Sequence, residues 1–163
     1  MARVWKFGDD VDTDQIVPGR YSPYMTSEAE LPKFAFIEFR PEFPKEVQPG
    51  DIIVAGDNFG CGSSREYAPL ALKKCGIAAI IANSFARIFF RNAINLGIPL
   101  FEDPEAVRQL EDGDQVELDA PAGRVTVGGK TISLRQPPRF VQDILAAGTI
   151  ADYIREYGHF PGE

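Results

Sequence analysis

Residues 56–66, GDNFGCGSSRE, bring three glycines, two serines and an arginine together directly before an apolar helical pattern. We call this segment the glycine–serine loop. It follows the buried run IIVA, and a helix is expected to begin near Ser64. A helix N-terminus exposes free N–H groups and carries a partial positive charge, so it favours anions. Arg65 adds a planar guanidinium that binds a carboxylate or a phosphate through two hydrogen bonds. The loop is therefore predicted to bind an oxyanion and to point one or two hydroxyls at it.

Spacing alone leaves other interpretations of this loop open. Ser63 or Ser64 can simply cap the helix, with Glu66 complementing the helix dipole. Phosphate is a competing ligand, although the lysine of a P-loop is absent. A hydrolase nucleophile is disfavoured, because G-x-S-x-G is missing and no triad signature points to the single histidine, His159. Position favours a ligand site, since ligands of open α/β sheets bind beyond the carboxyl ends of the strands.

A second polar segment, DDVDTDQIVPGR, carries aspartates at positions 9, 10, 12 and 14. Alternating acids are typical of calcium loops, but the glycine at the sixth position and the glutamate at the twelfth are missing here. A solvated acidic turn is the plainer interpretation. One buried aspartate that orients an arginine or a catalytic hydroxyl also fits the pattern.

The composition is that of a soluble globular protein, with 44% hydrophobic and 25% charged residues in a chain of 163. One domain over residues 1–163 is expected. The net charge of -7 and the scattered Lys and Arg residues argue against nucleic acid or an anionic membrane as a partner. With no membrane-length apolar run and no signal-peptide pattern, we expect a cytoplasmic protein.

The inventory of soft metal ligands is small. Cys61 and Cys75 are the only cysteines, and His159 is the only histidine. These residues make neither a disulfide framework nor a four-ligand zinc or iron–sulfur centre. Cys61 is expected to be a small apolar filler, and Cys75 is expected to be buried and inert.

Strand and helix patterns alternate from residue 51 to residue 101, which predicts an α/β fold with a parallel sheet and right-handed crossovers. Later, short alternating strands joined by a Gly128-Gly129 turn predict a β-rich annex. The expected strands are residues 4–7, 52–55, 77–81, 98–101, 115–120, 124–127 and 130–134. The expected helices are residues 65–74, 84–97 with Ser84 as N-cap, 104–110, 139–147 and 149–157. Residues 8–21 are expected to be a loop, and residues 22–49 a long excursion with a short helix around 27–33.

Three segments together carry a family resemblance: DDVDTDQIVPGRY, GDNFGCGSSREYAPLAL and IANSFARIFFRNAINLGIPL, in this order. They resemble the small subunits of homoaconitase and 3-isopropylmalate dehydratase, which match the swivelling domain of aconitase. The resemblance runs through nearly the whole chain. It implies a single swivelling β/β/α domain like the C-terminal domain of aconitase.

The resemblance also implies a hydro-lyase that acts only with a partner. A large subunit would carry a [4Fe-4S] cluster, whose open iron binds the hydroxyl and a carboxylate of a di- or tricarboxylic acid, in a heterodimer or heterotetramer. By motif, Ser63 matches the serine proposed to act as an alkoxide base, and Arg65 matches a substrate-carboxylate arginine. Ser64 matches a neighbouring contact, and Asp14 matches an active-site aspartate. Tyr67 departs from the histidine that many relatives have after SSRE.

In this family, the loop that here reads GRYSPYMTSEAEL is thought to contact the variable end of the substrate. Its polar residues are candidate substrate ligands, and they are Arg20, Tyr21, Ser22, Tyr24 and Thr26. A carboxylate arm needs donors or a cation, whereas an isopropyl group needs an apolar pocket. The loop therefore favours homoaconitase of the α-aminoadipate route to lysine over isopropylmalate isomerisation for leucine. Arg20 can instead be structural, paired with one of the preceding aspartates.

Three further questions stay open at this point. Arg87 and Arg91, four residues apart on one expected helix, can reach the large subunit or the substrate, although solvation is the plainer interpretation. The aromatic residues Phe34, Phe36, Phe39 and Phe43 fit either the core or an interface. A non-catalytic carboxylate-binding module is the alternative from another class, and a free-standing enzyme is disfavoured by the lack of metal ligands.

Overall fold

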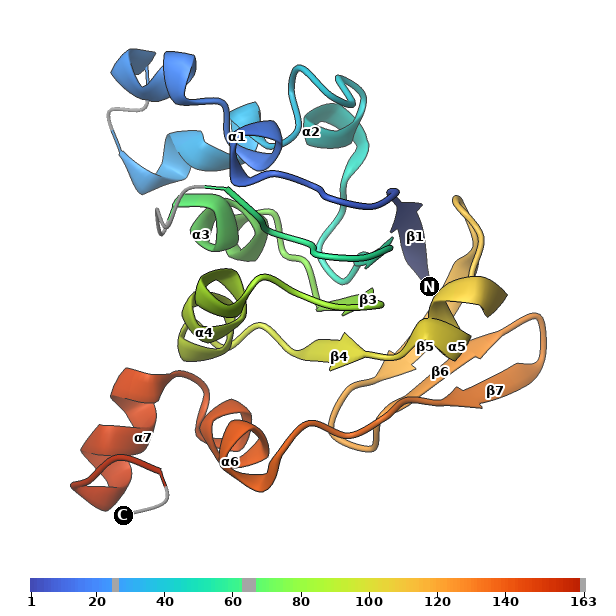
Figure 1. The fold of residues 1–163 in the computed structure, drawn as a ribbon, viewed down its shortest axis with the longest axis vertical. Helices are drawn as coiled ribbons and strands as arrows, with labels where there is room; N and C mark the ends of the chain where they lie inside the picture. The colour runs from blue at the N-terminus through green and yellow to red at the C-terminus, as the bar shows by residue number, and fades with distance from the viewer. Residues whose placement is uncertain (25–26, 63–66, 162–163) are drawn as a thin grey trace.

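The computed structural model describes residues 1–24, 27–62 and 67–161. Its centre is a seven-stranded sheet in the order β4-β3-β2-β1-β5-β6-β7 (Figure 1). The first four strands pair in parallel, and β5 to β7 continue the sheet in antiparallel pairing from β1. The strands are β1 (Ala2–Lys6), β2 (Ile52–Ala55), β3 (Ala79–Ala82), β4 (Leu100–Glu102), β5 (Gln115–Asp119), β6 (Arg124–Val127) and β7 (Lys130–Ser133).

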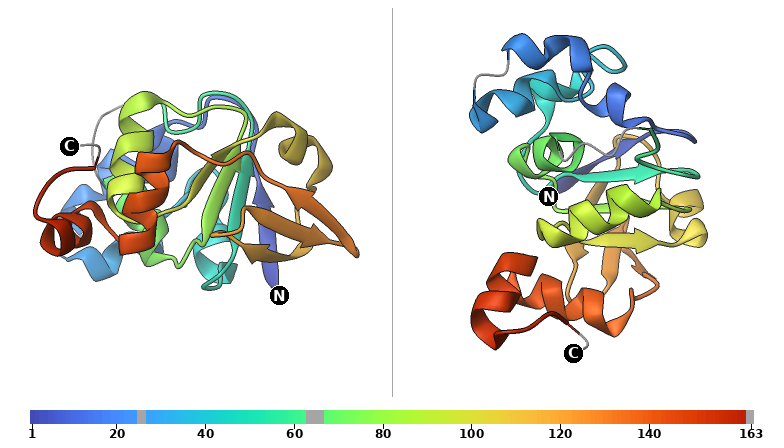
Figure 2. Two further views of the ribbon diagram at one scale, coloured as in Figure 1. Left: turned by 90° about the horizontal axis from the view of Figure 1, so that it is seen from below. Right: turned by 60° about the vertical axis from the view of Figure 1, so that its left-hand side comes forward.

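Helices fill the connections along the chain from β1 to β5, and further helices follow β7. Helices α3, α4 and α6 lie side by side on one side of the parallel strands, and α7 packs against α4 and α6 at the C-terminal end of the chain (Figures 1 and 2). The α-helices are α1 (Thr13–Ile16), α2 (Phe43–Glu46), α3 (Tyr67–Lys74), α4 (Arg87–Asn95), α5 (Pro104–Gln109), α6 (Arg139–Ala147) and α7 (Ile150–Tyr157), and the 3-10 helices are η1 (Gly19–Tyr24) and η2 (Glu28–Phe34).

Both faces of the parallel sheet are buried, because successive side chains of a strand point to opposite faces. Trp5 and Ile53 belong to the larger core, under the helices that include α3, α4 and α6. Val4 and Ile52 belong to a second core, which also contains residues of α5 and of the antiparallel strands. The strands therefore read as continuous apolar runs, as the sequence pattern predicted.

Most of the expected elements are confirmed. The strand-helix alternation, the hairpin turn at Gly128-Gly129 and the break at Gly148 are all present. The annex is not a separate sheet, because β5 pairs directly with β1. The excursion at 22–49 contains η2 and α2, and its expected short helix is a 3-10 helix. Among the four phenylalanines in question, Phe36 and Phe43 are fully buried in the larger core.

Two local expectations are wrong. The segment at 8–21, expected to be a loop, contains the short helix α1, which is stabilised by a capping box between Asp12 and Gln15. Ser84 does not cap α4. That helix begins at Arg87 with Ala86 as its N-cap residue, and the Ser84 hydroxyl accepts a hydrogen bond from the Asn58 N–H at 2.8 Å instead.

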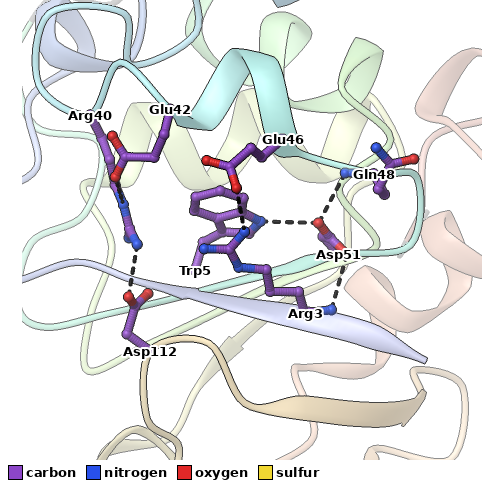
Figure 3. A network of polar contacts seen from close by, with 8 residues as sticks. All are labelled: Arg3, Trp5, Arg40, Glu42, Glu46, Gln48, Asp51 and Asp112. Atoms are coloured by element: carbon purple, nitrogen blue, oxygen red, sulfur yellow. Dashed lines mark hydrogen bonds and ion pairs between the residues drawn. The ribbon is translucent and has the colours of Figure 1, made fainter.

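A buried carboxylate fixes the start of the sheet (Figure 3). Asp51, only 3% exposed, accepts hydrogen bonds from the Arg3 N–H, the Trp5 indole N–H and the Gln48 N–H at 2.9 to 3.0 Å. Its own backbone carbonyl accepts from the Ala78 N–H. One residue thus joins β1, the turn before β2 and the segment that enters β3. A buried carboxylate costs little when all its acceptors are used, and it is expensive when they are not.

Figure 3 also shows a more exposed group of charges beside this carboxylate. The Arg40 guanidinium binds Glu42 at 2.9 Å and Asp112 at 2.8 Å, and it lies 4.7 Å from the centre of the Trp5 ring. Partial burial is the largest single effect on Asp112 and opposes its ionisation. The hydrogen bonds from Arg40 and from the Lys6 N–H, together with the charges of Arg40 and Arg3, outweigh it and lower the pKa of that carboxyl. Arg40 therefore holds the excursion at 22–49 against the turn before β5.

Within the part of the chain that the structure describes, no helix is long and apolar enough to cross a membrane.

We predict that Asp51→Asn destabilises the protein by about 1–3 kcal/mol, because the amide nitrogen places a donor where three N–H groups need acceptors. Urea unfolding followed by the fluorescence of Trp5, the only tryptophan, measures this. Glu46→Gln is the matched control. It removes only an exposed partner of Arg3 at 3.5 Å, which contributes about 0–1 kcal/mol. Equal unfolding midpoints for the two variants would contradict the role given to Asp51.

Candidate active site at the ends of strands β1 to β3

The glycine–serine loop continues the parallel pairing of β2 beyond the end of that strand. On one side, the Gly60 N–H donates to the Val11 carbonyl at 2.8 Å, and the Cys61 carbonyl accepts from the Thr13 N–H at 2.7 Å. On the other side, the Phe59 N–H and carbonyl bond to residues 84 and 86 at 3.0 and 2.9 Å. The described part of the loop, residues 56–62, is therefore held between the segments that follow β1 and β3.

Two glycines are required by this close approach. Gly60 has φ +85°, and a Cβ atom there would overlap the Phe89 ring. Gly62 has φ +101°, and a Cβ atom would lie 2.7 Å from the Asp12 carboxylate. Residues other than glycine rarely adopt such φ values. The backbone just before Ser63 is thus packed directly against the first turn of α1.

Asn58 ties the loop to both neighbouring segments. Its backbone has φ +58°, a conformation that asparagine tolerates better than most residues. Its N–H donates to the Ser84 hydroxyl, and its side-chain amide donates to the Asp10 carboxylate at 3.2 Å. Ser84 therefore has a positioning role that its place before an apolar helix did not reveal.

The four aspartates at 9, 10, 12 and 14 bond to N–H groups. Asp9 accepts from the Asp57 N–H at 2.7 Å, Asp12 caps α1, and Asp14 accepts from the Gly19 N–H at 2.9 Å. Within the described ranges, no group of three His, Cys, Asp or Glu residues is arranged to hold a metal ion. The acidic segment thus orders the backbone beside the glycine–serine loop. Asp14, a predicted catalytic residue, is exposed in the first turn of α1.

The two cysteines have different surroundings. Cys61 is half-buried within the glycine–serine loop, where burial and the charges of Asp12 and Asp10 raise the pKa of its thiol. Cys75 is buried at the end of α3, and burial raises the pKa of its thiol to about 12. Because a thiol must ionise to be a nucleophile or a metal ligand, Cys75 is inert, as expected.

Four predicted site residues, Ser63, Ser64, Arg65 and Thr26, lie outside the described residues. Ser22 and Tyr24 belong to η1, the turn that follows α1 and Pro18. The roles of all six residues stay predictions.

Arg20 and Tyr21 have partners within the chain. Arg20 forms an ion pair with Glu38 and lies 5.2 Å from the centre of the Tyr21 ring. Tyr21 stacks on Phe34, with 5.1 Å between ring centres. The alternative of a structural, paired Arg20 is confirmed, but its partner is Glu38 of the segment after η2 and not a preceding aspartate.

A concavity of about 590 Å³ opens beside the loop. Asn58, Gly60 and Gly62 line it on one side, and Arg87 and Arg91 of α4 line it on the other. Both arginines are exposed, so their solvation agrees with the structure. Their spacing of four residues places them on one helix face beside the loop, and contact with the substrate or the large subunit stays a prediction.

Comparison with known proteins agrees with this geometry. Residues 11–102 match the family model described as Aconitase C-terminal domain. The chain belongs to this family. It is 56% identical to the homoaconitase small subunit of Thermus thermophilus over the full length of both chains. It is 52% identical to 3-isopropylmalate dehydratase small subunit 1 of Deinococcus radiodurans, covering 100% of this chain and 92% of that one.

A solved structure supports the same assignment. The crystal structure of 3-isopropylmalate dehydratase from Methanocaldococcus jannaschii superposes with a TM-score of 0.88 at 46% identity, covering 96% of this chain and 93% of that one. The predicted α/β fold of the aconitase C-terminal domain type is thereby confirmed. These relatives also confirm that the chain is a small subunit of the homoaconitase and 3-isopropylmalate dehydratase type. It is therefore a subunit of a hydro-lyase.

We predict that Gly60→Ala costs more stability than Gly50→Ala. Both glycines have positive φ, but a Cβ atom at Gly50 would meet nothing within 4 Å, whereas at Gly60 it would overlap Phe89. Gly50→Ala should cost about 1–2 kcal/mol from backbone strain alone. Gly60→Ala should add about 1–3 kcal/mol from overpacking. Chemical denaturation measures both, and equal losses would show that the loop does not pack tightly on α4.

Proposed function

We propose that this family member isomerises a 2-hydroxy tricarboxylic acid, interconverting homocitrate, homoaconitate and homoisocitrate on the α-aminoadipate route to lysine. The observation that carries this proposal is the 56% identity to a homoaconitase small subunit over the full length of both chains. Isopropylmalate isomerisation for leucine is the second candidate. It is favoured by the 3-isopropylmalate dehydratase relatives and by the superposed structure.

The proposal assigns the metal chemistry to another chain. A [4Fe-4S] cluster needs several cysteine thiolates, and this sequence has two cysteines, one of them with a pKa of about 12. The residues present do not fit the cluster, so we place it on a large subunit that closes over the glycine–serine loop as a heterodimer or heterotetramer. A cytoplasmic location is part of the same proposal.

Proton transfer is the step that we assign to this chain. The Ser63 oxygen, as an alkoxide, would remove the proton from the substrate carbon and return it in the reverse direction. A neutral serine is a weak base, so nearby positive charge must favour its ionised form. Arg65 would supply that charge and hold a substrate carboxylate through two hydrogen bonds. Ser64 would add a hydroxyl contact.

Asp14 and the polar residues of η1 would complete the binding surface from the other side of the loop. Asp14 follows Asp12, whose carboxylate is packed against Gly62, directly before Ser63. In this proposal Tyr21, Ser22, Tyr24 and Thr26 offer hydroxyls to the substrate. Arg20 forms an ion pair with Glu38, so it is less available to bind a substrate carboxylate.

We predict that Ser63→Ala in the assembled enzyme lowers kcat by about 10²–10⁴-fold, with a smaller change in KM, because a general base acts in the transition state. Ser133→Ala is the control, since Ser133 is an exposed residue of β7 in the antiparallel part of the sheet. Turnover of Ser63→Ala near the wild-type value would remove Ser63 as the base. Binding of carboxylates without any turnover by the wild-type assembly would favour a non-catalytic module instead.

We predict a higher kcat/KM for homoaconitate or homoisocitrate than for isopropylmalate when the chain is reconstituted anaerobically with its large subunit. Hydroxyl groups and cations around the loop favour a carboxylate arm over an isopropyl group. A clear preference for isopropylmalate would assign the enzyme to the leucine route and leave the role of Ser63 unchanged.

A further inference from the structure

Three arginines differ from all the others that the structure describes. Arg87, Arg91 and Arg135 form no ion pair, whereas every other arginine in the described ranges is within 4 Å of a carboxylate oxygen. The chain has a net charge of -7, so carboxylates are plentiful. Unpaired guanidinium groups in such a chain are available to an anionic ligand.

Two of the three unpaired arginines lie beside the glycine–serine loop, and the third lies in an adjoining cleft. Arg87 and Arg91 line the concavity of about 590 Å³ that Gly60 and Gly62 also line. The same two arginines line an adjoining cleft of about 520 Å³ between α4 and α6, together with Arg135. Glu102 also lines that adjoining cleft, and it pairs with none of them.

The two sides of the loop carry opposite charge. On the β1 side, the carboxylates of Asp9, Asp10 and Asp12 contact the loop, and the last two help to raise the pKa of the Cys61 thiol. On the β3 side, Arg87 and Arg91 are unpaired. An anionic group placed over the loop is therefore repelled from the α1 side and attracted toward α4.

The proposed substrate has one carboxylate that the proposed site leaves without a cation. A tricarboxylate has one carboxylate for Arg65 and one for the cluster on the large subunit. The third needs another cation, and Arg20, the candidate from sequence, is paired with Glu38. Burying a carboxylate without a partner is costly, so the site must supply another cation for it.

We propose that Arg87 and Arg91 bind the third carboxylate of the tricarboxylic acid and so determine specificity against dicarboxylates. This inference rests on the proposed hydro-lyase function and deepens it. The cations assigned to the carboxylate arm are then in the first two turns of α4, and no longer in the loop after α1. Their spacing of four residues lets both guanidinium groups reach one anion from the same helix face.

The test compares Arg87→Gln, Arg91→Gln and the double variant in the enzyme assembled with its large subunit. Each single variant should lower kcat/KM for homoisocitrate by about 10–100-fold, mostly through KM, since a hydrogen bond to a charged group contributes about 1.5–3 kcal/mol. Values for isopropylmalate should stay within about threefold, because it lacks the third carboxylate. Arg87→Lys should recover part of the loss, as it keeps the charge without the planar fork.

Two controls accompany these variants. Arg139→Gln changes an exposed arginine of α6 that pairs with Asp143, and it should leave both substrates unaffected. Activity is also titrated against the large subunit for every variant, and the apparent affinity for that subunit should not change.

Each contrary outcome overturns the inference in a recognisable way. Equal losses for both substrates with weaker binding of the large subunit would make Arg87 and Arg91 docking residues. If Arg20→Gln lowered kcat/KM for homoisocitrate alone and the α4 variants did not, the third carboxylate would be bound by the loop after α1. A wild-type enzyme active only on isopropylmalate would reject the third-carboxylate site and leave the hydro-lyase proposal standing. Inactivity of the wild-type assembly on both would reject the two together.

Discussion

The site depends on backbone pairing that continues past the end of β2. Phe59, Gly60 and Cys61 bond to the segment after β1 on one side and to the segment after β3 on the other. Loops beyond the ends of parallel strands are ordinarily free to move apart, and here they are joined to one another. The cross-bonding brings the backbone before Ser63, the acidic turn of α1 and the start of α4 to one edge of the sheet. A catalytic group gains from such rigidity, because small displacements of a reacting atom are expensive.

The same arrangement creates a charge gradient across the loop. The carboxylates at 9, 10 and 12 are occupied in fixing backbone N–H groups and the Asn58 amide, so they stabilise the fold of the loop. Their charge is unfavourable both for an alkoxide at Ser63 and for an anionic substrate. Cations on the opposite side would compensate for this charge, and we propose that Arg87 and Arg91 of α4, which line the concavity beside the loop, supply them. In our proposal, the acidic and basic edges together would orient a substrate as well as bind it.

Much of this arrangement could be predicted from the sequence. The rest could not be predicted, because it depends on contacts between residues far apart along the chain. The strands and the breaks at Gly76 and Gly148 follow from local apolar runs and turn residues, so pattern was sufficient. The predicted anion-binding character of residues 56–66 also rests on local residue types, and it stays a prediction. The partners of Ser84, Arg20 and Asn58 are 26, 18 and 48 residues away along the chain, and no local pattern encodes such contacts. The prediction of Ser84 as a helix cap is therefore wrong, whereas Asp9, Asp10 and Asp14 are exposed, as the solvated-turn interpretation predicted. Asp12 and Gln15 did offer a local signal, since their spacing is that of a capping box.

The most direct test of the account is whether a partner subunit and substrate cover the glycine–serine loop. Cys61 reports on this, because it is half-buried within the loop, while Cys75 is buried elsewhere and serves as the internal reference. Alkylation by iodoacetamide is followed by peptide mass spectrometry at alkaline pH, where enough of the Cys61 thiolate forms. The account predicts that Cys61 reacts in the isolated chain and is slowed by about tenfold or more in the active assembly with substrate. An unchanged rate of Cys61 alkylation in an assembly that turns over substrate would contradict it, because the active site would then lie away from this edge of the sheet.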